Sequence, residues 1–107
     1  MKIYLAGPMT GLPDFNFPAF HALAYRLRER GLTVVNPAEV NPDQAMSWAE
    51  CMRRDIAELV TCDAIALLPG WQKSKGALLE HHIAERLELK LYTVTDKGLA
   101  KLATVAA

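Results

Sequence analysis

The feature that most constrains the fold of this chain is an alternation of short apolar runs with longer amphipathic segments. Four apolar runs are each typical of a buried strand: residues 2–6, 32–36, 63–69 and 90–94. Between them lie segments that repeat apolar residues at helical spacing, beginning near Pro18, Ser47 and Lys75. Parallel neighbours in a sheet need crossover helices of this kind, so the pattern predicts a βαβαβαβα order.

Local signals predict where several of these elements begin and end. Gly31 stands where a glycine would end the first helix, and Ser47 with Glu50 fits a capping box that starts the second. Asp96 is expected to cap a last helix that runs to about Ala103. We therefore expect a single α/β domain over residues 1–107, a three-layer sandwich with a small parallel sheet of the flavodoxin or Rossmann type.

Composition narrows the class of protein. A chain of 107 residues that is 51% hydrophobic suits one compact core. Twelve basic residues balance twelve acidic ones, so no overall field attracts a nucleic acid polymer or a membrane surface. No run approaches the roughly 18 apolar residues of a membrane span, and we expect a cytoplasmic protein without a leader. Cys51 and Cys62 are expected to be reduced and core-facing, with no metal or other cofactor.

The expected fold also predicts where a ligand binds. In open α/β sheets, ligands bind beyond the carboxyl ends of the strands, near the point where the strand order reverses. Three segments follow such strand ends in this sequence: residues 7–17, 36–46 and 69–75. The first is long for a connection in a small domain, which is typical of loops that contact ligands.

Glu80 lies just after the third of these segments. Helical spacing from Lys75 places it on the apolar side of its helix, together with Ile83 and Ala84. A solvated carboxylate that gains from the helix dipole would explain this position without any function. The alternative is a nucleophile or general base that faces the ligand crevice, with Gly76 leaving room for an approach to the backbone.

Three other polar residues are candidates for a structural or a functional role. Asp55 lies inside the second helix, where it forms either a surface ion pair or a second functional acid. Asp63 opens the third strand, where it is expected to satisfy a turn. Tyr4 alternates with core residues of the first strand and is either part of the wall or a phenol that orients a carboxylate.

Three stretches of the sequence together resemble a known family. They are "IYLAGP" at the first strand, "DIAELVTCDAIALLP" around the third, and "SKGALLEHHIA" after it. These stretches are similar to the nucleoside 2-deoxyribosyltransferases and to their relatives, the 2'-deoxynucleoside 5'-phosphate N-hydrolases. The opening "IYLAGPMTG" and the compact length resemble a small uncharacterised branch of that superfamily in bacteria and phages. The resemblance covers most of the chain.

This resemblance implies catalytic roles for residues already singled out. Glu80, four residues after Gly76, matches the Glu that attacks the anomeric carbon and forms a glycosyl ester. Asp55, eight residues before Asp63, matches the acid that transfers a proton to the leaving base. Tyr4 matches a tyrosine of the first strand that orients the nucleophile.

The resemblance also implies how substrate is bound. Ser74, six residues before Glu80, matches the 5'-phosphate hydrolases and favours a nucleoside monophosphate. Ser74, the loop at residues 7–11 and the following helix N-terminus would donate to the phosphate. Trp71 either stacks on the base or seals a core edge or subunit contact, whereas His81 and His82 are expected to be structural or solvated. The expected substrate-binding residues are Gly7, Pro8, Met9, Gly11, Trp71, Ser74 and Gly76.

The sequence thus predicts cleavage or transfer at the N-glycosidic bond of a nucleoside or nucleoside 5'-monophosphate, through Glu80 as nucleophile. Two alternatives stay open: a non-catalytic nucleotide-binding or regulatory module, and a structural protein derived from a phage. A homodimer is expected in each case, because a short α/β chain leaves helix faces that a second copy can cover. The base, the sugar and the choice between hydrolysis and transfer are not fixed by the sequence.

Overall fold

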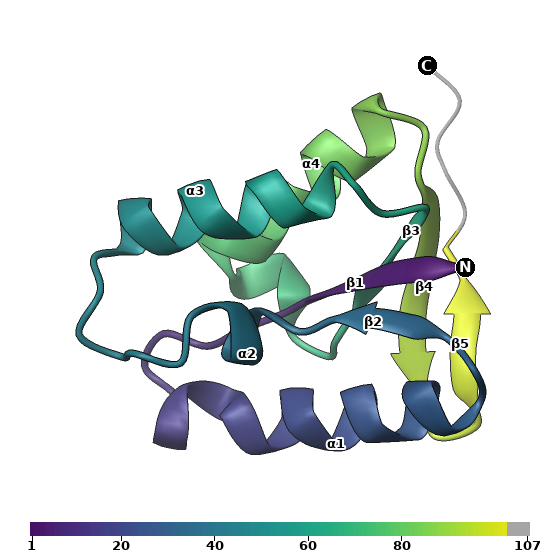
Figure 1. Cartoon of the computed structure of the whole chain (residues 1–107), viewed down its shortest axis with the longest axis horizontal. Helices are drawn as coiled ribbons and strands as arrows, with labels where there is room; N and C mark the ends of the chain where they lie inside the picture. Colours follow the sequence, from purple (N-terminus) through teal and green to yellow (C-terminus); the bar gives the residue numbers. More distant parts are fainter. Residues whose placement is uncertain (103–107) are drawn as a thin grey trace.

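A computed structural model describes residues 1–102 and contains a five-stranded sheet between two layers of helices (Figure 1). The strands are β1 (Lys2–Ala6), β2 (Thr33–Val35), β3 (Ala64–Leu67), β4 (Lys90–Thr95) and β5 (Gly98–Lys101). Their order in the sheet is β2-β1-β3-β4-β5, and the first four are parallel. The expected α/β sandwich with a mostly parallel sheet is confirmed.

The helices occupy both faces of this sheet. They are α1 (Phe17–Glu29), the short α2 (Pro37–Val40), α3 (Trp48–Leu59) and α4 (Lys75–Arg86), with 3-10 turns at Pro13–Asn16 and Trp71–Lys73. Helix α1 covers one face, while α3 and α4 cover the other (Figure 1). Two of the predicted helix ends are confirmed: Gly31 has φ 84°, and the Ser47 hydroxyl accepts a hydrogen bond from the Glu50 amide at 3.2 Å.

Strand β1 lies inside the sheet, between β2 and β3, and divides its side chains between the two layers. Ile3 and Leu5 belong to the core under α1, whereas Tyr4 and Ala6 belong to the core under α3 and α4. Tyr4 is fully buried and is paired in register with β2 on one side and β3 on the other. Its position is therefore fixed by two strand ladders at once.

The end of the described chain differs from the sequence prediction. The expected helix after Asp96 is wrong: residues 98–101 form β5, which pairs antiparallel with β4. The Thr95 hydroxyl accepts from the Lys97 amide at 3.2 Å and donates to the Gly98 carbonyl at 3.1 Å. These bonds close a two-residue hairpin, which an Asp can begin as readily as it caps a helix. The expected end of that helix, Ala103, lies outside the described residues.

The sheet has a switch point between β1 and β3. Because α1 and the α3–α4 pair lie on opposite faces, the connections that leave these two strands diverge at their carboxyl ends. The strand ends themselves stay close, since the Leu68 amide donates to the Ala6 carbonyl at 2.8 Å. A Cβ on Gly7 would lie 2.7 Å from that of Leu68, so only glycine fits this approach.

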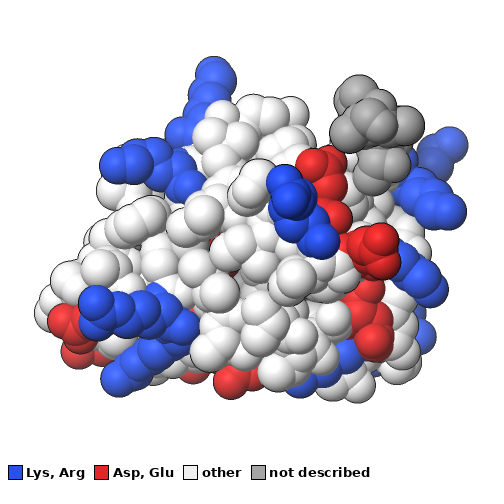
Figure 2. All heavy atoms as spheres, turned by 90° about the horizontal axis from the view of Figure 1, so that it is seen from above, with Lys and Arg blue, Asp and Glu red and all other residues white. Residues whose placement is uncertain are grey.

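Seen from the side of α3 and α4, the surface has a broad uncharged area between scattered charged side chains (Figure 2). Exposed apolar side chains of this side, 38–53% accessible, form what we call the α3–α4 apolar face: Trp48, Val60, Leu78, Leu79 and Leu87. No helix within residues 1–102 is both long enough and apolar enough to cross a membrane.

Candidate active site

A cavity of about 730 Å³ opens at the carboxyl ends of β1, β2 and β3. Its walls come from the loop after β1, the segment that joins β2 to α3, and the first turns of α4. This is the edge of the sheet, beside the switch point, where the sequence predicted a ligand-binding crevice.

Two carboxyl groups lie in the wall of this cavity. Glu80 from α4 is 5% exposed and Asp55 from α3 is 7% exposed. The interpretation of Glu80 as a solvated helix-dipole residue is therefore wrong. Asp55 is bonded to an uncharged partner, Asn41, at 2.7 Å, and not to a neighbouring arginine as a surface ion pair would require. Two buried acids in one wall demand an explanation beyond surface electrostatics.

The phenol of Tyr4 interacts with both acids. Its hydroxyl donates a hydrogen bond to Glu80 Oε2, and hydrogen bonding from the same phenol lowers the pKa of Asp55. Burial, followed by the charges of Glu80 and Asp55, raises the pKa of Tyr4 well above its usual value. The phenol is therefore neutral and acts as a donor.

Burial raises the pKa of both acids. It brings Glu80 to about 8, against the opposing hydrogen bond from Tyr4 and with a further contribution from the charge of Asp55. Asp55 rises to about 7, against the hydrogen bonds from Asn41 and Tyr4. Because the acids interact, the pair holds one proton near neutral pH. One ionised carboxylate beside one acid is the combination that breaks glycosidic bonds.

Asn41 is a cavity residue that sequence analysis did not identify. It is 5% exposed, lines the cavity, and follows α2 in the segment after β2. Its place after a strand end was the available signal, but Asn is also common in turns. Cys51 corrects another expectation: Cys62 lies in the core, whereas Cys51 is half-buried in the cavity wall. Burial raises the pKa of the Cys51 thiol, so it is neutral.

The first turn of α4 forms the opposite side of the cavity. Ser74 is the N-cap of α4, and its hydroxyl accepts from the Ala77 amide at 3.2 Å, which leaves the hydroxyl proton for another acceptor. The amide groups of the first helical turn lack intrahelical partners and make the end electropositive. Lys73 and Lys75 line the same side of the cavity. This end of the cavity is suited to an anion.

Gly76 also lines the cavity, but the space beside it is occupied. A Cβ there would lie 3.2 Å from Met52 Sδ and 3.6 Å from Trp48 Nε1. The glycine thus allows α3 to approach α4 and brings the helices that carry the two acids together.

The loop after β1 contributes part of what the sequence predicted. Three of its expected residues line the cavity: Gly7, Pro8 and Met9. Gly11 is exposed and is not part of the lining. Phe15 and Phe17 also line the cavity, with ring centroids 6.3 Å apart.

Trp71 does not line the cavity. Its ring lies 4.7 Å from that of His81 and packs against the core under α3 and α4. Of its two interpretations, this position favours sealing a core edge. His82 is exposed, so both histidines lie outside the cavity lining, in agreement with the sequence prediction.

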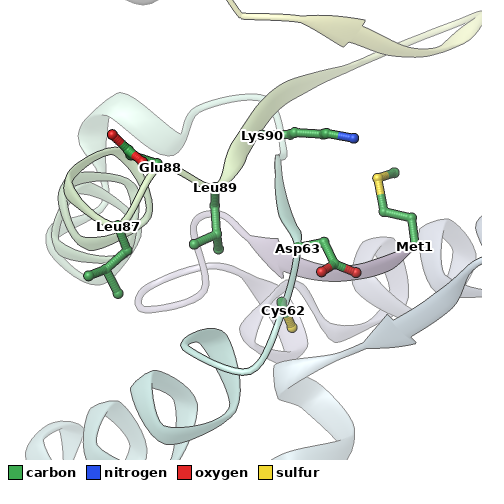
Figure 3. A pocket seen from close by; sticks show the side chains of 7 residues that line it. All are labelled: Met1, Cys62, Asp63, Leu87, Glu88, Leu89 and Lys90. Atoms are coloured by element: carbon green, nitrogen blue, oxygen red, sulfur yellow. The ribbon is translucent and has the colours of Figure 1, made fainter.

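A second hollow, of about 480 Å³, lies at the opposite edge of the sheet (Figure 3). Its residues come from segments at the amino ends of the parallel strands: Met1, Cys62, Asp63, Leu87, Glu88, Leu89 and Lys90. Asp63 accepts a hydrogen bond from the Lys2 amide at 2.9 Å, which is a structural contact with the start of β1 and not with the expected turn. Within residues 1–102, no group of three or more His, Cys, Asp or Glu side chains could hold a metal ion.

The family described as "Domain of unknown function (DUF4406)" matches residues 1–93 of the chain. None of the curated proteins matches it.

Three solved structures have a similar fold. The CMP N-glycosidase of Clostridium botulinum has a TM-score of 0.61 at 20% identity, over 87% of this chain and 67% of its own. The 2-deoxyribosyltransferase of Bacillus psychrosaccharolyticus has a TM-score of 0.66 at 21% identity, over 90% and 74%. That of Leishmania mexicana has a TM-score of 0.68 at 18% identity, over 95% and 78%. At these identities the likeness shows the fold, which is the one that the resemblance implied.

The raised pKa values predict how stability depends on pH. Folding raises the pKa of Glu80 from 4.5 to about 8, so the folded protein holds this proton more tightly than the unfolded chain. The resulting stability is complete below about pH 4.5 and is lost as the pH rises through 8. The melting temperature of the wild type should therefore fall between pH 5 and pH 9. In the Glu80→Gln variant, which cannot ionise, the fall should be smaller.

The matched control is Glu85→Gln, an exposed glutamate on the same helix. It should follow the wild-type curve when melting is measured by circular dichroism across the pH series. If Glu80→Gln loses as much stability as the wild type, Glu80 does not hold a proton in the folded protein.

Proposed function

The chain belongs to the family described as a domain of unknown function (DUF4406), and we propose that it cleaves or transfers the N-glycosidic bond of a nucleoside or nucleoside 5'-monophosphate. One observation carries this proposal: Glu80 and Asp55 are buried in one cavity wall and share the phenol of Tyr4. The fold is also that of an N-glycosidase and of two deoxyribosyltransferases, which supports the same class of reaction.

In the first step, Glu80 acts as the nucleophile. Its Oε2 is held by the Tyr4 hydroxyl, which leaves Oε1 to attack the anomeric carbon of the sugar. The bond from that carbon to the base breaks, and its electron pair stays on the base nitrogen. Asp55 gives its proton to the base. The products are a free base, a glycosyl ester on Glu80 and an ionised Asp55.

In the second step, an acceptor resolves the ester. A water molecule, or the nitrogen of a second base, attacks the anomeric carbon and passes its proton to the Asp55 carboxylate. The bond between the sugar and Oε1 breaks, and its electron pair returns to Glu80. Both acids then recover their starting charges.

Substrate itself adjusts the charges of the two acids. In the empty cavity the pKa of Glu80, about 8, is above that of Asp55, about 7, whereas the reaction needs Glu80 ionised and Asp55 protonated. Positive charge that develops on the sugar stabilises an ionised Glu80, and negative charge on the leaving base raises the proton affinity of Asp55. The shared proton is then held by Asp55, where the leaving base requires it.

We further propose that a 5'-phosphate binds at the start of α4. The Ser74 hydroxyl, the first amide groups of the helix, and the ammonium groups of Lys73 and Lys75 would all favour a dianion there. A neutral nucleoside would gain nothing from these groups. They support a nucleoside 5'-monophosphate as the preferred substrate.

We also propose a homodimer in which a second copy covers the α3–α4 apolar face. Trp48 of α3 and Leu78 and Leu79 of α4 are exposed residues of this face. Burying such a surface against itself is favourable, and a small α/β chain gains most from it. The cytoplasmic location expected from the sequence remains a prediction.

The first prediction concerns base release. Purified protein incubated with nucleosides and their 5'-monophosphates should release free base, detected by chromatography. Glu80→Gln should lower kcat/KM at least about a thousandfold because the nucleophile is gone. Asp55→Asn should lower it by about 10²- to 10⁴-fold through the loss of proton transfer.

For the wild type, kcat/KM should peak between about pH 7 and pH 8, where the acid pair holds one proton, and fall on both sides. Base release that survives Glu80→Gln would contradict the nucleophile assignment. Nucleotide binding without base release from any substrate would instead favour the non-catalytic binding module.

The second prediction tests the phosphate end of the cavity. Ser74→Ala should lower kcat/KM for a 5'-monophosphate by about tenfold, with a much smaller effect on the matching nucleoside. Both this variant and Ser47→Ala lose an N-cap bond of 3.2 Å, so both should lose about 1 kcal/mol of stability. Ser47→Ala is the matched control because Ser47 is outside the cavity lining. Equal losses on nucleoside and monophosphate in Ser74→Ala would refute a phosphate role.

The third prediction tests the dimer by analytical ultracentrifugation. The wild type should sediment as a dimer, and Leu78→Glu should shift it toward monomer because a charge would be buried in the α3–α4 apolar face. Tyr25→Glu is the control, since Tyr25 is 67% exposed but lies on α1, across the sheet. A monomeric wild type, or equal effects of both variants, would argue against this interface.

A further inference from the structure

We propose that Asn41 is a positioning residue for Asp55: its amide aims the carboxyl group into the cavity and makes Asp55 ready to give up its proton. The consequence for catalysis rests on the proposed function. The claim about the protonation of Asp55 does not, and it can be tested on the protein alone.

The amide of Asn41 joins two helices beside the cavity. It follows α2, and its Nδ2 donates to Asp55 Oδ1 at 2.7 Å and to the Cys51 carbonyl at 3.3 Å. Cys51 lies one helical turn before Asp55 on α3. A donor-acceptor distance of 2.7 Å is in the range of hydrogen bonds to ionised groups. Both contacts hold the amide nitrogen against α3.

The amide oxygen of Asn41 lies in a different environment from its nitrogen. Asn41 Oδ1 is buried and has no hydrogen-bond partner within the part of the chain that the structure describes. A buried acceptor without a partner is destabilising. Turning the amide over would not help, because the Cys51 carbonyl only accepts and needs the nitrogen. The two bonds that Nδ2 donates therefore set the orientation of the Asn41 amide, and Oδ1 accepts no bond from another described residue.

The amide of Asn41 is the group that most stabilises the ionised form of Asp55. The titratable groups that interact with Asp55 are Tyr4 from β1, Glu80 from α4 and Cys51 from its own helix, and none is a cation. The Tyr4 hydroxyl already donates to Glu80. Burial raises the pKa of Asp55, and the bond from Asn41 is the largest effect that opposes the rise.

An acid that must donate its proton near neutral pH should not be held too firmly in the protonated form. Without Asn41, only Tyr4 would oppose the effect of burial, and the pKa of Asp55 would be higher. With it, Asp55 can donate to a leaving base and then remain as a stabilised carboxylate that takes a proton from the acceptor. Asn41 thus acts through Asp55 and needs no contact with substrate.

The test compares two buried asparagines. Asn41→Leu keeps the branched shape and the number of side-chain heavy atoms and removes the donor. Asn36→Leu is the matched control, because Asn36 is 1% exposed and bonds to Ala38 and His21 instead of Asp55. The pKa of Asp55 would be measured by NMR of carboxyl-labelled aspartate, with the resonance identified by its loss in Asp55→Asn. It should rise by about one unit or more in Asn41→Leu and stay unchanged in Asn36→Leu.

The kinetic arm uses the same variants. The alkaline limb of kcat/KM should move to higher pH in Asn41→Leu, with a maximum lowered by about tenfold or more, while Asn36→Leu should keep the wild-type profile. A general loss of activity without a displaced limb would indicate a merely structural role and overturn the proposal.

A third measurement needs no variant at Asn41 and decides the matter if Asn41→Leu fails to fold. In the wild type, the side-chain amide protons of Asn41 should shift with pH at the midpoint of the Asp55 titration. Amide resonances that ignore this titration, or an unchanged pKa of Asp55 in folded Asn41→Leu, overturn the inference. If no nucleoside releases base, the proposed function fails, and the NMR measurements still decide the role of Asn41.

Discussion

The rest of this structure depends on one constraint: two carboxyl groups are buried beside one phenol. Asp55 and Glu80 are each less than one-tenth exposed. Their burial is unfavourable, and hydrogen bonds from Tyr4 and Asn41 offset part of the lost hydration. Strand β1 must bring Tyr4 between the two helices, and Gly76 must let those helices approach. The packing of α3 against α4 and the hydrogen bonds to the two acids therefore depend on each other.

The sequence predicted the elements whose signals are local and redundant. Alternating apolar runs indicated the parallel strands, and Gly31 and Ser47 marked helix ends through backbone requirements that few residue types meet. The error at Asp96 has a physical origin: a short side-chain acceptor suits a helix cap and a turn equally. What decided between them was the free edge of β4, which is a tertiary feature absent from local sequence.

The candidate site was predictable only in part, for a related reason. Residue type and spacing indicated Glu80 and Asp55, but they could not tell a contact with substrate from a contact with the protein itself. Gly76 was expected to leave room for a ligand, and the room is taken by side chains of α3. Asn41 was missed because its importance comes from a hydrogen bond to a residue on another helix, which no local pattern encodes.

The place of β1 in the sheet also determines when the site can exist. Tyr4 is synthesised before the strand that completes its ladder and before the helix that carries Glu80. An emerging chain can form the β1–α1–β2 unit and still have no acceptor for the phenol. The two acids can therefore come together beside the phenol only after α4 has been synthesised.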